Sequence, residues 1–186
     1  MRARPIAGSE RVGQAFVQLI APYRYPASFD AAKVTEIRRM KARVETERMP
    51  RGADKNRQLK LGRGGLTDVE WLVQLLQLQH AHAHPELQTT GTITALMAMV
   101  EAGLVSAEDA EVLRTAWELA TKIRGLNVLR TGRATDTLTT VRSDLEAIAR
   151  WCGYPPHSAR DLEEDYLRTT RQARAVYERL FYPATP

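Results

Sequence analysis

Residues 67–82 read TDVEWLVQLLQLQHAH and carry a clear periodicity. Apolar side chains recur three and four positions apart, at Val69, Leu72, Val73 and Leu76. That spacing places them on one face of an α-helix, which has 3.6 residues per turn. Thr67 precedes these apolar residues, and Glu70 follows Thr67 by three positions, which is the pattern of a capping box at a helix N-terminus. The segment therefore predicts an amphipathic helix that begins near Thr67.

The same period runs through most of the remaining chain. Apolar residues at helical spacing also occur in residues 9–20, 30–44, 92–100, 106–126, 141–149 and 158–180. Pro22 is expected to end the first of these helices, and the Lys and Arg side chains of the second are expected on its outer face. No segment keeps the period of two that is typical of a β-strand. The sequence predicts an all-α bundle of about seven helices, with mostly antiparallel neighbours.

The composition is that of an ordinary globular domain, with 44% apolar and 26% charged residues among 186. A net charge of +5 would suit a nucleic-acid partner, but the 27 basic residues are interleaved with 22 acidic ones. A mixed solvated surface is therefore favoured, and a basic nucleic-acid binder is the weakest hypothesis. No apolar run has the length of a membrane span, so no membrane partner is expected. The single cysteine, Cys152, fits a reducing compartment and predicts a cytoplasmic location.

The stretch from Leu59 to Trp71, LKLGRGGLTDVEW, is the most unusual one for chemistry. Three glycines within four residues lead into a helix N-terminus, where free N–H groups and the helix dipole favour anions. Lys60 and Arg63 add two positive charges beside them. The stretch is suited to hold a phosphate chain or an acidic loop of a partner. A purely structural interpretation, in which the glycines only allow a tight turn, stays open.

Metal sites and nucleophiles are not predicted. Asp68 and Glu70, like Asp161 and Glu163, are two positions apart, so they point to opposite sides of a helix and cannot chelate one ion. His80 and His84 are one helical turn apart, but no third zinc ligand is evident. No nucleophile with a neighbouring base is recognisable. The chain therefore does not look like a complete enzyme, and we predict no catalytic residue and no metal ligand in it.

Residues 60–74, KLGRGGLTDVEWLVQ, resemble the signature K-x-G-x-G-G-I-x-D-I-E-F-x-x-Q of a known family. That signature belongs to the helical domain that follows the nucleotidyltransferase module in glutamine-synthetase adenylyltransferases and PII uridylyltransferases. Residues 2–8, 126–129 and 135–138 are similar to the adenylyltransferase branch. Leu66, Val69 and Trp71 replace the more usual Ile, Ile and Phe of the signature. The similarity covers nearly the whole chain.

The resemblance implies a function for the intact protein. An adenylyltransferase transfers AMP from ATP, with Mg²⁺, to a tyrosine of glutamine synthetase, and a separate half of the polypeptide removes it. The resemblance also implies PII signalling protein as a further partner. The catalytic module of the family carries a G-S motif followed by a D-x-D pair on a strand, and this chain lacks that combination. By itself the chain is therefore expected to be inactive and to bind neither ATP nor Mg²⁺.

The resemblance also implies boundaries and roles. Residues 1–27 are expected to form an exit segment from the nucleotidyltransferase module plus the first helix, residues 28–182 the helical domain, and residues 183–186 a frayed tail. The residues expected to contact the nucleotide or the catalytic module are Lys60, Arg63, Gly64 and Gly65. The residues expected to orient the loop without contacting the ligand themselves are Asp68, Glu70 and Gln74. The alternative is a helical interaction module that docks glutamine synthetase or PII without touching nucleotide.

Overall fold

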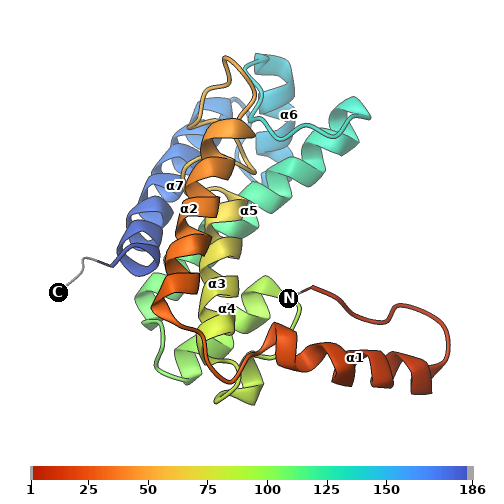
Figure 1. The fold of residues 1–186 in the computed structure, drawn as a ribbon. Coiled ribbons are helices and arrows are strands. Elements are labelled where there is room, and N and C mark those ends of the chain that lie inside the picture. The colour runs from red at the N-terminus through yellow and green to blue at the C-terminus, as the bar shows by residue number, and fades with distance from the viewer. Residues whose placement is uncertain (1, 184–186) are drawn as a thin grey trace.

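The computed structural model describes residues 2–183, and in that range the chain forms seven α-helices and one short 3-10 turn (Figure 1). The elements are α1 (Glu10–Arg24), α2 (Ala31–Glu47), α3 (Leu66–His80), η1 (Pro85–Leu87), α4 (Thr92–Glu101), α5 (Ala107–Thr131), α6 (Arg142–Cys152) and α7 (Ala159–Phe181). The predicted all-α fold is confirmed. Of the tail predicted to fray, residues 184–186 lie outside the described residues.

Two clusters of buried side chains form the core. The first joins α2, α3, α4, the N-terminal half of α5 and the C-terminal half of α7, with members such as Val34, Val73, Leu96, Leu113 and Tyr177. The second joins the rest of α5 and α7 with α6 and the segments before α3 and α6, with members such as Leu59, Ile123, Leu138, Ile148 and Tyr166. Trp117 of α5 packs against both clusters. The two long helices α5 and α7 therefore hold the domain together from end to end.

The order of these contacts sets the helix directions. α5 contributes Leu113 to the first cluster and Ile123 to the second, whereas α7 contributes Tyr166 to the second and Tyr177 to the first. The two helices are therefore antiparallel, as Figure 1 shows. α3 begins in the second cluster with Leu66 and continues into the first, so it runs in the same direction as α7. The N-terminus of α3 consequently lies beside the middle of α7.

Helix α1 projects from the bundle instead of packing into it (Figure 1). None of its residues is buried. Its apolar stripe is uncovered, with Val12 57%, Phe16 44%, Leu19 69% and Tyr23 82% exposed. The predicted end at Pro22 is wrong, because the helix continues to Arg24. A proline this near the C-terminus removes only one N–H donor of the last turn, and the Tyr25 N–H still donates to the Ala21 carbonyl at 2.8 Å.

The segment that precedes α3 is tied to the segment that precedes α6. Gln58 and Thr137 form an isolated antiparallel bridge. On either side of it, the Leu59 N–H donates to the Asp136 carbonyl at 2.7 Å and the Leu138 N–H donates to the Arg57 carbonyl at 2.8 Å. The residues immediately before the glycine-rich stretch are therefore held against the second core cluster. None of the helices within residues 2–183 is long and apolar enough to cross a membrane.

Candidate functional site

The glycine-rich loop, residues 59–65, leads directly into α3 and lies against α7. Gly64 has a φ of +69°, and a Cβ atom on it would lie 1.9 Å from the Thr170 carbonyl oxygen of α7. A Cβ atom on Gly62 would lie 2.1 Å from the Gln58 carbonyl oxygen. Both distances are far below van der Waals contact, so only glycine allows the backbone to come this close. Gly64 therefore serves the packing of the loop onto α7, and Gly62 serves the tight turn of the segment itself.

The N–H groups that the sequence offered to an anion have partners inside the fold. The Gly64 N–H donates to Asp68 Oδ2 at 2.7 Å, and the Gly65 N–H donates to the Gly62 carbonyl at 3.0 Å. Both glycines are buried. The expectation of free donors at Gly64 and Gly65 therefore does not hold, because the turn into α3 uses these donors itself.

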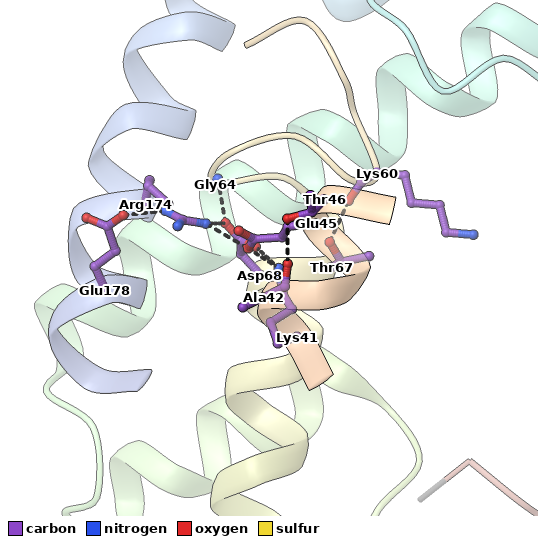
Figure 2. A network of polar contacts seen from close by, with 10 residues as sticks. All are labelled: Lys41, Ala42, Glu45, Thr46, Lys60, Gly64, Thr67, Asp68, Arg174 and Glu178. Atoms are coloured by element: carbon purple, nitrogen blue, oxygen red, sulfur yellow. Dashed lines mark hydrogen bonds and ion pairs between the residues drawn. The ribbon is translucent and has the colours of Figure 1, made fainter. Parts of the chain in front are cut away.

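Asp68 is the centre of a buried cluster of charges that joins three helices to the loop (Figure 2). Its carboxylate accepts hydrogen bonds from Lys41 Nζ of α2 at 2.6 Å and from Arg174 Nη1 of α7 at 3.0 Å, in addition to the Gly64 N–H. The side chains of Asp68 and Lys41 are each 1% exposed. A buried carboxylate is stable only with such compensation by charges and donors. One side chain of α3 thus fixes α2, α7 and the loop to one another.

Two further carboxylates balance the charges around Asp68. Glu45 accepts from Lys41 at 2.5 Å and from Arg174 at 3.0 Å, and Glu178 accepts from Arg174 Nε at 2.7 Å. Burial alone would raise the pKa of Glu45, but its hydrogen bonds and ion pairs with Lys41 and Arg174 hold the pKa below its ordinary value. Burial likewise opposes the charge of Arg174, yet Asp68 and Glu178 raise its pKa. Glu45 and Arg174 are therefore both ionised at neutral pH.

The capping box predicted from Thr67 and Glu70 is wrong. The N-cap residue of α3 is Gly65, and no side chain caps the helix. Because the helix already begins at Leu66, Thr67 lies inside the first turn, and its N–H and Oγ1 both donate to the Lys60 carbonyl at 3.0 and 2.8 Å. The Lys60 side chain points away from the Asp68 cluster (Figure 2) and is exposed. Thr67 thus holds the backbone of the loop while the ammonium group of Lys60 stays in solvent.

Glu70 and Gln74, expected beside Asp68 behind the loop, face other sides of α3. Positions two and six residues beyond Asp68 are rotated from it by about 200° and about 240° around a helix axis. Glu70 pairs instead with Arg2 at 2.8 Å, and Gln74 Nε2 donates to the Glu70 carbonyl at 3.0 Å. Of these three side chains, Asp68 is the one with a hydrogen bond to the loop within the described residues.

The acidic and histidine pairs considered for metal binding have other contacts. Glu163 pairs with Arg57, and His84 Nδ1 lies 3.0 Å from Glu86 Oε1. Among residues 2–183, no group of three or more His, Cys, Asp or Glu side chains is arranged to hold a metal ion.

Comparison with known proteins identifies the family. Residues 38–181 match the family model described as GlnD PII-uridylyltransferase. The chain belongs to this family.

Relatives of this member of the GlnD PII-uridylyltransferase family are named bifunctional glutamine synthetase adenylyltransferase/adenylyl-removing enzyme. The relative from Streptomyces avermitilis is 52% identical over 185 residues, which is 99% of this chain, and the one from Leifsonia xyli is 50% identical over 182 residues, which is 98% of it. The chain spans 18% of the length of each of these relatives. The predicted resemblance to the adenylyltransferases and to the related uridylyltransferase domain is confirmed.

The matched range of the GlnD PII-uridylyltransferase family contains the whole charge cluster, since Lys41, Asp68 and Arg174 all lie between residues 38 and 181. Helix α1 lies outside it. The match to the family model therefore includes the cluster but not α1, whereas the alignments with the two relatives cover nearly the whole chain.

Lys41 and Arg174 are site residues that the sequence analysis missed. Lys41 was expected on the outer face of its helix but is fully buried. Its position was a usable signal, because it follows Val34 by seven residues and Ile37 by four, which places it on the apolar face of α2. Both cations lie over the ring of Tyr177, at 5.3 and 5.1 Å from its centroid. A charged residue within an apolar stripe thus indicated a buried ion pair.

Proposed function

We propose that this chain is the helical part of an enzyme that uses ATP to transfer AMP to a tyrosine of glutamine synthetase in the cytoplasm. The observation that carries the proposal is 52% identity over 99% of the chain to a glutamine synthetase adenylyltransferase. The chain spans 18% of that relative and has no D-x-D pair. We therefore assign the catalytic groups and the residues that bind Mg²⁺ to other parts of the full-length protein. The helical part supports the nucleotidyltransferase module and the docking of substrate.

Helix α1 is the proposed contact with that module. Residues 1–27 serve as the connection from the module, and residues 28–182 as the helical domain. The support is physical: an isolated helix of about 12–15 residues is marginally stable in water, and α1 has 15 residues, none of them buried. Its stripe of Val12, Phe16, Leu19 and Tyr23 needs an apolar partner to be covered. The adjoining module of the same polypeptide supplies that partner.

The loop is the proposed contact with nucleotide or with the module. Lys60 and Arg63 are exposed cations on either side of Gly62, and the Asp68 cluster holds the loop that carries them. Both side chains are suited to the phosphate groups of ATP. Gly64 and Gly65 contribute by packing, which sets the position of Arg63.

Kinetics of the full-length enzyme test this proposal. Lys60→Ala and Arg63→Ala are expected to raise the KM for ATP or lower kcat in the adenylylation of glutamine synthetase, with Arg39→Ala, an exposed arginine of α2, as the matched control. The 186-residue chain alone, mixed with ATP, Mg²⁺ and glutamine synthetase, is expected to transfer no AMP. Transfer by the chain alone would contradict the assignment of the catalytic groups to other parts of the protein.

The alternative function is a docking module for glutamine synthetase or PII that never touches nucleotide. It is favoured by the internal hydrogen bonds of Gly64 and Gly65, which explain the glycines without any ligand. The same variants discriminate the two. If Lys60→Ala and Arg63→Ala leave kcat and the KM for ATP unchanged but weaken the binding of glutamine synthetase or PII, the docking function is correct.

A further inference from the structure

A groove of about 400 Å³ lies between the glycine-rich loop and α7. Its lining includes Arg63 from the loop, Asn56 from the preceding turn, and Leu167, Arg171, Arg174 and Glu178 from α7. The four α7 residues are spaced four, three and four positions apart, so they form one face of that helix. The groove therefore has one wall of loop and one wall of helix.

The charges in this groove are unequal. Three guanidinium groups and one carboxylate line it. Arg174 is committed to Asp68, Glu45 and Glu178. Within the described part of the chain, neither Arg63 nor Arg171 has a carboxylate partner, and the Arg171 Nε donates only to the Leu167 carbonyl of its own helix, at 3.2 Å. Two guanidinium groups are thus left to face the same space.

The two walls are held together by one carboxylate. Asp68 Oδ2 accepts from Gly64 N–H in the loop and from Arg174 Nη1 in α7. Gly64 also lies directly against Thr170 of α7, since a Cβ atom there would lie 1.9 Å from its carbonyl oxygen. Arg63, which immediately precedes Gly64, has its N–H bonded to the Lys55 carbonyl at 3.3 Å. The backbone of Arg63 is therefore fixed relative to Arg171 before any ligand arrives.

We infer that this groove binds the phosphate groups of a nucleotide through Arg63 and Arg171. Guanidinium groups bind phosphate oxygens through two parallel N–H···O bonds, which gives both strength and orientation. The volume falls at the lower end of the range of about 300–1,000 Å³ that is typical of small-ligand sites, and it is too small for the surface of a folded partner. Asn56, which also lines the groove, adds a carboxamide donor.

The inference deepens the proposed function, on which it rests for the choice of a nucleotide as ligand. It moves the expected anion contact from the N–H groups of Gly64 and Gly65 to side chains that include Arg171 of α7. It also replaces the expectation from the sequence that the chain alone binds no ATP. Lys60 does not line the groove, so of the two contacts proposed for it, nucleotide or nucleotidyltransferase module, this inference leaves the module. Arg174 acts here as a positioning residue, because its own charge is already compensated.

Binding to the folded 186-residue chain tests the inference, with ATP and inorganic tripolyphosphate as probes in isothermal titration calorimetry. Arg63→Ala and Arg171→Ala are each expected to weaken binding at least tenfold, and the double variant to abolish it. Arg39→Ala on α2 is the matched control and is expected to bind as the unchanged chain does. Thermal unfolding at the same midpoint shows that each variant is folded.

Each result decides the inference. No binding of either probe to the unchanged chain at millimolar concentration, or equal binding by Arg63→Ala and Arg171→Ala, overturns it. Equal affinity for tripolyphosphate and ATP supports a site that binds the phosphate groups without contacting the nucleoside. Tighter binding of ATP supports a site that also contacts the nucleoside. Binding of an oligoglutamate peptide in place of both probes overturns it in favour of an acidic protein segment.

The proposed function can fail separately. If the groove binds ATP but Arg63→Ala and Arg171→Ala leave AMP transfer by the full-length enzyme unchanged, the binding site is supported and its role in the transfer reaction is contradicted. If the groove binds no phosphate but the full-length enzyme still adenylylates glutamine synthetase, the inference falls and the proposed enzyme stands.

Discussion

Replacing Asp68 with Asn tests whether the buried carboxylate holds the domain together. The substitution keeps the size of the side chain but removes the charge that Lys41 and Arg174 share, and it replaces one acceptor oxygen by an NH₂ group facing N–H donors. Removing one partner of a buried ion pair costs about 3–5 kcal/mol. Both cations retain Glu45, so we expect the lower end, a loss of about 3 kcal/mol. For a domain of this size that lowers the midpoint of thermal unfolding by roughly 6–12 °C.

Urea and thermal unfolding followed by circular dichroism measure this loss, with Asp161→Asn at an exposed position of α7 as the matched control. The control is expected to change the free energy of unfolding by less than about 0.5 kcal/mol. Adding Lys41→Met to Asp68→Asn is expected to recover part of the loss, because it removes a buried cation that keeps only Glu45 as its carboxylate partner. A loss below about 1 kcal/mol for Asp68→Asn, or strictly additive effects in the double variant, would refute the reasoning.

Three further predictions concern the glycine-rich loop, the loss of folding stability at acid pH, and α1. Gly64→Ala is expected to lower the free energy of unfolding by at least about 3 kcal/mol. Gly132 has a similar φ, but no atom lies within 4 Å of a Cβ added there, so Gly132→Ala is expected to cost about 1–2 kcal/mol. Equal losses of the two variants in urea titrations would contradict the close approach of Gly64 to α7. Because the pKa of Glu45 is lower in the folded chain than its ordinary value of 4.5, its charge stabilises the fold above that pH, and this contribution is lost as the pH falls through the folded pKa. Stability measured from pH 7 to pH 3 should therefore fall less steeply for Glu45→Gln than for the unchanged chain, and identical slopes would count against the ion pairs. Phe16→Ser is expected to change the thermal midpoint of the 186-residue chain very little, because Phe16 is exposed. Leu96→Ala in the core is expected to lower the free energy of unfolding by about 2–5 kcal/mol, with a clear drop in the midpoint. A comparable drop in the midpoint for Phe16→Ser would show that α1 packs against the bundle.

Several elements of the fold followed from local sequence. The side chain of Asp30 accepts from the Lys33 N–H and that of Ser106 from the Asp109 N–H, so two helix starts are capped as the residue types suggest. The last helix differs. Ser158 makes no capping hydrogen bond, and the Glu146 carboxylate of α6 accepts the Ala159 N–H instead, at 3.1 Å. A cap supplied by another helix cannot be read from neighbours in the sequence.

The sequence by itself determined the helices, the bundle and the family, because apolar periodicity and the 60–74 motif are local patterns. It also indicated Asp68 and Arg63 as residues of interest. Only the tertiary structure decided what Asp68 does, since its partners Lys41 and Arg174 are 27 and 106 positions away in the chain. The same holds for the groove, which Arg63 and Arg171 both line because Gly64 lets the loop touch α7. Local spacing sets which face a side chain occupies, but the packing of helices decides which charges meet there.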